Sequence, residues 1–583
     1  MKNIYFLFIT IFILSCKTET KTEQSFETLF ETSDGTQTAT YVEVIDYWKA
    51  LADSYKEIDI KAFGLTDSGY PLHLVTLNND GNFDFDQLRN DHRIMLINNG
   101  IHPGESDGID ATMMLFRDIV QGKISWPEKT ILAAIPIYNI GGALNRNTGT
   151  RANQNGPEAY GFRGNAQNYD LNRDFIKSDT KNARTFAQIF HYVKPDVFID
   201  NHVSNGADYQ YVLTHLFTQH NKLQGDLGIF MEATMRPELE SKLEEKDWII
   251  TPYVSAFRNT PEYGFSQFMD YPRYSSGYTT LFNTLGMMVE THMLKPYKPR
   301  VEGTYELMKS MIEITEEQHE TIGNLRAKAW KDVVSKETYP VDWKIDTTRA
   351  STIKFKGYEA ERIPSEVTGD MRLKYFRDRP FEKDVVYKNH FVPRTEVSIP
   401  KGYIIPQGWH KVISLLKLNQ IEMRQLQKDS IIKVEAYRIT NYQTRRNAYE
   451  GHYPHYGVEV SSEVKDISFR QGDYVIDVDQ EGVRYLLETL EPSAPDSFFN
   501  WNFFDTILQQ KEHFSSYVFE DTAKELLDSD ANLKTEFEAM KANDEHFAKS
   551  GYMQLNWLYK NSNHYEQAHM QYPVFRLLSS PKN

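Results

Sequence analysis

The chain has 583 residues, of which 40% are hydrophobic and 25% are charged, a balance typical of folded domains. This length exceeds what one ordinary hydrophobic core serves, so two or three domains are expected. The formal net charge of −16 argues against a general nucleic-acid binder, because a phosphate backbone attracts basic surfaces.

The N-terminus has the features of an export signal. Lys2 precedes twelve apolar or small residues, from Ile4 to Ser15. At a rise of 1.5 Å per residue they span roughly 18 Å, short of a hydrocarbon core of about 30 Å, which favours a signal peptide over a membrane-spanning helix. Cys16, the only cysteine, follows directly, and the segment resembles a bacterial lipoprotein signal. We therefore expect an exported, lipid-anchored protein of the cell envelope without disulfides; an ordinary secretory signal is the alternative.

Apolar runs of strand length alternate with helix-like segments along the first half of the chain. The runs are LHLVTL (72–77), RIMLI (93–97), ILAAIPIYNI (131–140), DVFIDNHV (196–203) and GMMVETH (286–292). This alternation predicts an α/β fold, with a mixed, mainly parallel sheet covered by helices on both faces. In such a sheet, ligands bind beyond the carboxyl ends of the strands.

The predicted domain organisation follows from these changes in pattern. After the signal of residues 1–15 comes a polar tether, 16–38, and then the α/β domain, 39–325. Residues 326–400 show no long helical pattern and are expected to form an irregular linker region. Residues 401–583 contain short strand patterns such as SIIKVEAYRI and then helical, aromatic-rich ones, which predict a β-rich module ending in helices.

The first candidate site residues are His102 and Glu105, which follow the RIMLI run in a turn containing Gly100 and Gly104. Imidazole and carboxylate are both good zinc ligands, and the three-residue spacing lets both face one ion. Alone, an HxxE pair is weak evidence, since a glutamate there can also cap the following helix. A catalytic zinc takes three protein ligands, and His202, at the end of another apolar run, is the best third candidate.

Other polar residues near these runs could complete a site. Asp200 and Asn201 could hydrogen-bond the histidines. In the stretch RGNAQNYDLNRDF, the side chains of Arg163, Asn172 and Arg173 could bind an anion or a developing oxyanion, although each alone could be a surface group.

Glu290 stands inside the apolar run GMMVETH. Burying a carboxylate is costly unless it is paired, and burial would raise its pKa toward that of a general base. A solvent-exposed position at the strand edge is the alternative.

The ordered set HPGE, RGNAQNYDLNRDF, a strand-end histidine and a strand-borne glutamate resembles the zinc carboxypeptidases of the carboxypeptidase A type, over roughly residues 40–320. The resemblance implies one Zn²⁺ per chain, bound by His102, Glu105 and His202, and a catalytic Glu290. It also implies that Arg163 polarises the scissile carbonyl, while Asn172 and Arg173 grip the terminal carboxylate of a peptide or protein substrate.

The tyrosine that contacts the substrate in that family has no unambiguous match. The stretch YPRYSSGY offers Tyr271, Tyr274 and Tyr278, of which we prefer Tyr278. The function predicted is hydrolysis of a C-terminal peptide bond. A related zinc amidohydrolase acting on acylated amino acids or cell-wall peptides, and a noncatalytic surface binding protein, are the alternatives.

Overall fold

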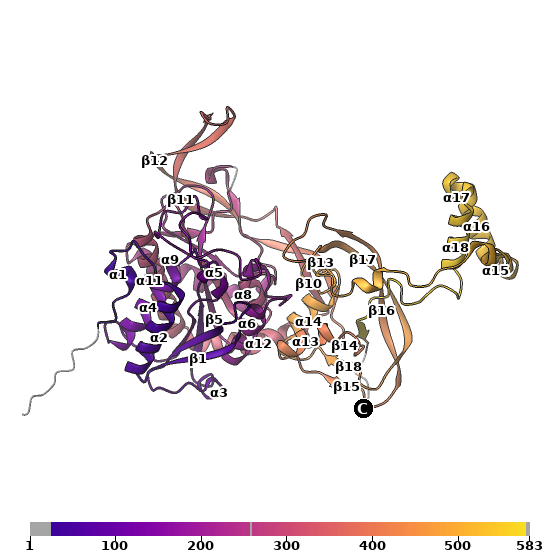
Figure 1. Ribbon diagram of the computed structural model, residues 1–583, viewed down its shortest axis with the longest axis horizontal. Helices are drawn as coiled ribbons and strands as arrows, with labels where there is room; N and C mark the ends of the chain where they lie inside the picture. The colour runs from indigo at the N-terminus through magenta and orange to yellow at the C-terminus, as the bar shows by residue number, and fades with distance from the viewer. Residues whose placement is uncertain (1–24, 257–258, 579–583) are drawn as a thin grey trace, which may run out of the picture.

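The computed structural model describes residues 25–256 and 259–578. Two lobes lie side by side: an α/β lobe that extends to Val334, and a C-terminal module that begins near Gly402 (Figure 1). The expected fold class is confirmed, because a large mixed sheet with helices is followed by a β-rich region that ends in helices. Within the described ranges, none of the helices combines the length and apolar character that crossing a bilayer requires.

An eight-stranded sheet forms the centre of the α/β lobe, with the order β1-β2-β4-β3-β5-β9-β6-β7. The four central strands, β4, β3, β5 and β9, are parallel to one another. The strands are β1 (Ile58–Leu65), β2 (Pro71–Leu77), β3 (Arg93–Asn98), β4 (Thr130–Ile135), β5 (Val197–Ser204), β6 (Leu213–Phe217), β7 (Ile250–Pro252) and β9 (Leu285–His292). The continuous apolar runs became these strands because both faces of the sheet are covered.

Helices cover both faces of this sheet. The chain moves from β3 through α4 (Asp107–Val120) to β4 on one side of β3, and then through α6 (Lys181–Val193) back to β5 on the other side. Because parallel crossovers are right-handed, these opposite movements place α4 and α6 on opposite faces. The direction of winding therefore changes between β3 and β5, and a cleft beyond their carboxyl ends is where an α/β sheet binds ligands.

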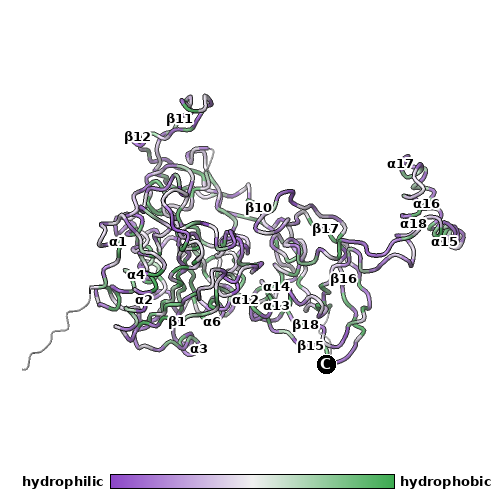
Figure 2. The backbone as a smooth tube through the Cα atoms, viewed as in Figure 1, coloured by the Kyte–Doolittle hydropathy of each residue, from purple (hydrophilic) through white to green (hydrophobic). Residues whose placement is uncertain are grey.

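The remaining helices of the lobe complete these layers. They are α1 (Leu29–Thr32), α2 (Tyr41–Ser54), α3 (Phe85–Leu88), α5 (Ile140–Leu144), η1 (Leu171–Arg173), α7 (His220–Leu223), α8 (Gly225–Phe230), η2 (Met231–Met235), α9 (Arg236–Glu244), η3 (Pro261–Tyr263), α10 (Ser275–Thr280), α11 (Tyr297–Glu317) and α12 (His319–Val334). Helix α11 packs beside α4. Hydrophobic residues gather on the strands at the centre of the lobe (Figure 2).

Two of the predicted segment boundaries differ from the structure. The described part of the expected tether, residues 25–38, folds onto the lobe, with Phe26 and Phe30 buried. Its sequence looked polar because only a few apolar side chains make the contact. The expected irregular region 326–400 completes α12 and then forms strands β10 (Thr338–Ile345), β11 (Ser351–Pro364), β12 (Met371–Lys388) and β13 (Phe391–Ser398).

Strands β11 and β12 form a long hairpin that projects away from the lobe (Figure 1). Most of its outer residues are exposed on both faces, so the outer parts of the strands lack the apolar alternation that would have revealed them. At its base, β12 pairs with β8 (Phe265–Ser266).

The C-terminal module is built on a six-stranded sheet of order β15-β18-β14-β19-β16-β17. Its elements are β14 (Gly402–Ile405), α13 (His410–Leu418), β15 (Arg424–Gln425), β16 (Ser430–Thr444), β17 (His455–Phe469), β18 (Tyr474–Asp477), α14 (Val483–Leu490), η4 (Asp505–Leu508) and β19 (Phe575–Leu577). Between η4 and β19 the chain forms α15 (Ser516–Ser529), α16 (Ala531–Asn543), α17 (Glu545–Lys549) and α18 (Gly551–Lys560), which stand apart from the sheet (Figure 1). The terminal helices therefore start later than the aromatic stretch after Asp496 suggested.

Candidate metal centre and active site

Three buried side chains meet beyond the carboxyl ends of β3 and β5. His102 and Glu105 lie in the turn between β3 and α4, and His202 lies near the end of β5. Each residue is 3% exposed, and their potential ligand atoms all lie within 4.8 Å of one another. The structure therefore brings together the three residues that the sequence singled out as ligands.

Two glycines shape the turn that carries His102 and Glu105. Gly100 has a φ of +67°, a backbone conformation that residues other than glycine rarely adopt. A Cβ on Gly104 would lie only 2.5 Å from Cδ of Arg151 and 3.0 Å from the carbonyl oxygen of Gly161. The HPGE turn is therefore held close to the next loop of the lobe.

The donor set fits a metal ion. Nδ1 of His102 and Nδ1 of His202 each lie 3.1 Å from a different oxygen of Glu105. On the far side of the rings, Nε2 of His102 faces Asp170 at 3.0 Å and Nε2 of His202 faces Asp200 at 2.9 Å. Metal-binding histidines characteristically have such carboxylate partners. Nδ1 of His102 is buried, and its contact with Glu105 lacks good hydrogen-bond geometry, so a cation at the focus would satisfy it.

The electrostatics of the cluster also favour a cation. Burial alone would raise the pKa of Glu105, but the charges of His102 and Arg151 and the histidine hydrogen bonds hold that pKa well below its usual range. Burial would lower the pKa of His202, yet the Asp200 and Glu105 carboxylates raise it well above its usual value. The carboxylates thus attract positive charge into a pocket from which water is largely excluded.

Arg151 is a neighbour of the cluster that the sequence analysis missed. Its Nη2 lies 2.9 Å from Oε1 of Glu105, and Gln154 Nε2 donates to the Gly104 carbonyl at 2.7 Å. Both residues belong to a loop without a periodic sequence pattern. Only their closeness in sequence to RGNAQNYDLNRDF could have suggested that they lie near the site.

Glu290 lies on β9, directly beside the third ligand. In the parallel register of β5 and β9, Glu290 is the partner of His202, and its backbone carbonyl accepts a hydrogen bond from Thr214 Oγ1 at 2.7 Å. Burial raises the pKa of the Glu290 carboxyl to about 7; His202 opposes this shift, and the negative charges of Glu105 and Asp200 add to it. The group therefore has the proton affinity that a general base requires near neutral pH.

The predicted anion-binding residues surround Asp170, which the sequence analysis did not name. Arg163 donates two hydrogen bonds to Asp170 Oδ2, at 2.8 and 3.0 Å, while its Nη1 lies 3.8 Å from Glu105. Asp170 also caps the short helix η1 that carries Asn172 and Arg173, accepting from the Asn172 N–H at 3.0 Å. The Asp170 carboxylate thus links His102 to the side chains of Arg163 and Arg173 and to the backbone of Asn172. The sequence could have pointed to Asp170, because aspartate is a preferred residue at the start of a helix and Asp170 comes two residues before Asn172.

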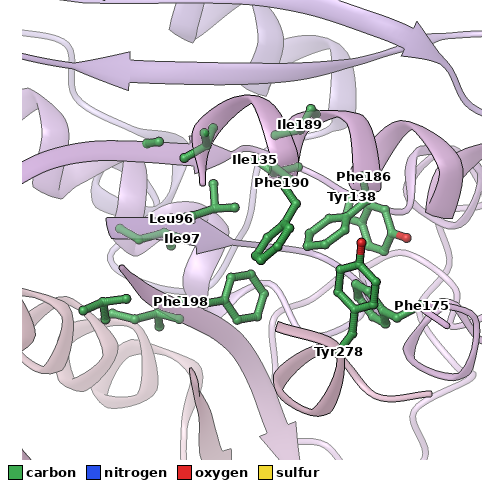
Figure 3. Close-up of a cluster of buried hydrophobic side chains, with 14 of the residues drawn as sticks. Leu96, Ile97, Ile135, Tyr138, Phe175, Phe186, Ile189, Phe190, Phe198 and Tyr278 are labelled. Carbon is green, nitrogen blue, oxygen red and sulfur yellow. The ribbon is translucent and has the colours of Figure 1, made fainter. Parts of the chain in front are cut away.

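The structure places Tyr278 away from the site. Its side chain is fully buried, with the hydroxyl donating to Asn419 at 2.5 Å and the ring packed beside Phe175 and Phe190 (Figure 3). Tyr278 is therefore a core residue, and the expectation that it contacts substrate is corrected. Tyr274, one turn earlier, lies instead beside the anion-binding group, since the Arg173 guanidinium stands 4.6 Å from its ring centre.

The two suggested partners of the histidines behave differently. Asp200 contacts His202, as described above, whereas the Asn201 amide donates to Asn99 at 2.8 Å and contacts neither histidine. Successive residues of a strand face opposite sides of the sheet, so only one of two neighbours can reach the site.

The comparisons with known proteins point to one group of enzymes. No protein-family model matches the chain. Carboxypeptidase 2 of Trichophyton rubrum is 21% identical over 428 residues, which cover 68% of this chain and 72% of that protein.

Solved structures of similar proteins carry related descriptions. The carboxypeptidase A of Helicoverpa armigera shares 12% identity, covering 48% of this chain and 74% of that chain, with a TM-score of 0.36. A metallo-carboxypeptidase of Burkholderia cenocepacia shares 15% identity, covering 47% and 68% of the two chains, with a TM-score of 0.35. The chain is thus similar to a curated carboxypeptidase, the group of enzymes that its sequence motifs resemble.

Proposed function

We propose that this chain is a zinc-dependent carboxypeptidase that removes the C-terminal residue of peptides or proteins. The observation that carries the proposal is the buried cluster of His102, Glu105 and His202, with Glu290 next to His202 in the strand register. Each part alone has a structural explanation, but a base beside a three-ligand cluster has the composition of a hydrolytic metal site.

His102, Glu105 and His202 would hold the zinc ion, with Asp170 and Asp200 fixing the histidine rings. When bound, zinc lowers the pKa of a coordinated water and polarises the carbonyl that is attacked. Asp170 and Asp200 each accept the proton on Nε2 of a histidine. The Nδ1 atoms, which face Glu105, are then left unprotonated and free to bind the metal.

Glu290 would remove a proton from the attacking water and return it to the leaving amine. Its raised pKa suits both transfers, since the same carboxyl must accept and then release a proton near neutral pH. Arg163, whose side chain is 45% exposed, would donate to the oxyanion that forms on the scissile carbonyl.

Arg173 and Asn172 would bind the terminal carboxylate of the substrate. A guanidinium presents paired N–H donors that match a carboxylate, and this geometry restricts cleavage to the last peptide bond. Arg173 keeps part of its side chain accessible, at 23% exposure, while its Nη1 donates to the Asn172 carbonyl at 2.8 Å.

The test combines metal analysis with a single variant, Glu290→Gln. We expect the wild type to bind about one zinc per chain and to hydrolyse peptides with a free C-terminus but not their C-terminal amides. Glu290→Gln should retain the metal and lose about a thousandfold or more in kcat, because the amide cannot take the proton. A variant with full turnover contradicts the mechanism, and hydrolysis of acyl-amino acids alone favours the amidohydrolase.

We also propose that the protein is exported and anchored to a membrane through a lipid on Cys16. This residue lies outside the described residues, so the proposal rests on the signal-like sequence before it. In bacterial cells, wild-type protein should fractionate with membranes and incorporate a labelled fatty acid, whereas Cys16→Ser should do neither. Equal labelling of both would contradict the assignment.

A further inference from the structure

The loop between β16 and β17 of the C-terminal module docks onto the α/β lobe beside the candidate site. Tyr449 and His452 close a tight turn through two backbone hydrogen bonds, and His452 Nε2 lies 2.8 Å from Asp179 of the lobe. Gly451, with φ of +79°, approaches so closely that a Cβ there would lie 2.5 Å from the Tyr169 hydroxyl. The loop is therefore fitted against the segment that leads into η1.

Glu450, in the same turn, reaches the backbone of the anion-binding segment. Its Oε2 accepts a hydrogen bond from the Asp170 N–H at 2.9 Å. The Asp170 side chain in turn contacts His102 and Arg163 and caps the helix that carries Asn172. Glu450, a residue of the C-terminal module, thus holds the backbone of Asp170, whose side chain makes these contacts.

A second acid of the C-terminal module holds the segment on the other side of Asn172. Asp496, with a fully buried side chain, accepts from the Arg273 N–H at 2.8 Å and pairs with its guanidinium at 2.7 Å. The next two residues contact the carboxylate-binding pair. The ring of Tyr274 lies beside the guanidinium of Arg173. The N–H of Ser275 donates to Asn172 Oδ1 at 3.2 Å.

We propose that Glu450 and Asp496 are positioning residues, which hold the carboxylate-binding pair Asn172 and Arg173 in register with the metal centre. The C-terminal module is then part of the catalytic unit and not a separate binding domain. This inference rests on the proposed carboxypeptidase function.

The physical reason is that the anchor lies on loops. One candidate ligand, His202, lies in a packed strand, and the other two lie in the turn that follows β3. By contrast, η1 has three residues and α10 has six, so neither element has much rigidity of its own. A misplacement of about 1 Å at a substrate-positioning group can cost about a hundredfold in rate. Two hydrogen-bonding acids supplied by another module reduce that freedom.

The test uses the full-length, zinc-loaded protein and variants of Glu450, because removing the buried Asp496 would leave Arg273 without its partner and endanger folding. Glu450→Ala loses the hydrogen bond to Asp170, whereas Glu450→Gln keeps an oxygen that can accept it. Glu459→Ala is the matched control, since Glu459 is exposed on β17 and its side chain makes no hydrogen bond or ion pair within the described chain.

For a peptide with a free C-terminus, Glu450→Ala should raise KM about tenfold or more, with a smaller change in kcat. The inhibition constant of the released amino acid should rise in parallel, because it also needs the carboxylate anchor. Glu450→Gln should restore most of both values, and Glu459→Ala should leave them unchanged. Zinc content and melting temperature should be the same in all of these proteins.

Three outcomes overturn the inference. If wild type hydrolyses the peptide and Glu450→Ala keeps its KM and inhibition constant, Glu450 does not position the anchor and the proposed function stands. If kcat falls with KM unchanged, or Gln fails as badly as Ala together with a lowered melting temperature, the role is only structural. If wild type itself hydrolyses no free C-terminal peptide, the proposed function fails and the inference falls with it.

Discussion

The two halves of the candidate site are built in different ways. The metal-binding half comes from the ends of neighbouring parallel strands, and its three ligands are each 3% exposed. The carboxylate-binding half comes from η1 and the start of α10, which the C-terminal module braces through Glu450 and Asp496. The candidate metal cluster therefore depends mainly on the sheet and the turn after β3, whereas the proposed substrate anchor depends on contacts between the lobes.

The largest effect is expected from removing a ligand in the metal-binding half. His202→Ala should abolish stoichiometric zinc binding and lower activity by about a thousandfold or more, because a two-ligand site holds a catalytic ion poorly. Zinc analysis after dialysis and steady-state hydrolysis measure both quantities. His319→Ala, on the far helix α12, is a matched control, since its ring contacts only a backbone carbonyl among the described residues. Full zinc retention in His202→Ala would remove this residue from the ligand set.

A smaller effect should follow from weakening a carboxylate that supports a ligand. Asp200→Asn leaves a group of the same shape beside His202 and should weaken zinc affinity about 10- to 100-fold, because the ring loses a charged partner. Competition with a zinc-binding dye measures the affinity. The substitution Asn201→Asp provides the contrast, since Asn201 does not contact the histidine. If Asp200→Asn binds zinc as tightly as wild type, its carboxylate has no role in orienting the ligand.

The difference between the two halves also explains what the sequence could predict. Continuous apolar runs identify buried parallel strands, so residues at their ends, such as His102, His202 and Glu290, could be expected to meet. Glu450 is 280 positions from Asp170, and no periodicity links them. Nor does a run of tyrosines reveal which one faces the core, and the buried Tyr278 was therefore preferred over Tyr274, whose ring lies beside Arg173.

The same reasoning applies to the β-rich half of the chain. Strand β16 could be predicted because apolar and polar residues alternate along SIIKVEAYRI and its buried residues share one face. The projecting hairpin of β11 and β12 could not, because most of its residues face solvent on both sides. Burial, which produces the sequence pattern, is confined to residues near the base of the hairpin, such as Phe355 and Val385.

A still smaller effect is expected in the carboxylate-binding half. Arg173→Lys keeps the charge but loses the paired N–H donors, so KM for a free C-terminal peptide should rise about tenfold with little change in zinc content. Michaelis–Menten kinetics measure the change in KM, and metal analysis measures the zinc content. Arg446→Lys, at an exposed position on the β16–β17 loop that makes no hydrogen bond or ion pair with the described part of the site, should behave like wild type. An unchanged KM in Arg173→Lys would mean that the carboxylate is bound elsewhere.

The smallest effect concerns the stability of the metal-free protein and sharpens the assignment of Glu290. Its pKa is raised from 4.5 to about 7, so the folded state binds the proton more tightly than the unfolded state does. Ionisation of Glu290 therefore costs stability progressively as pH rises from about 4.5 to 7, and by about 1–3 kcal/mol in total. Glu290→Gln removes this cost and should raise the melting temperature of the zinc-free protein at pH 8 more than at pH 5. Glu459→Gln, on an exposed strand position, should show no such pH-dependent difference. Equal shifts at both pH values for Glu290→Gln would mean that the carboxyl titrates normally and is not held in a desolvated position.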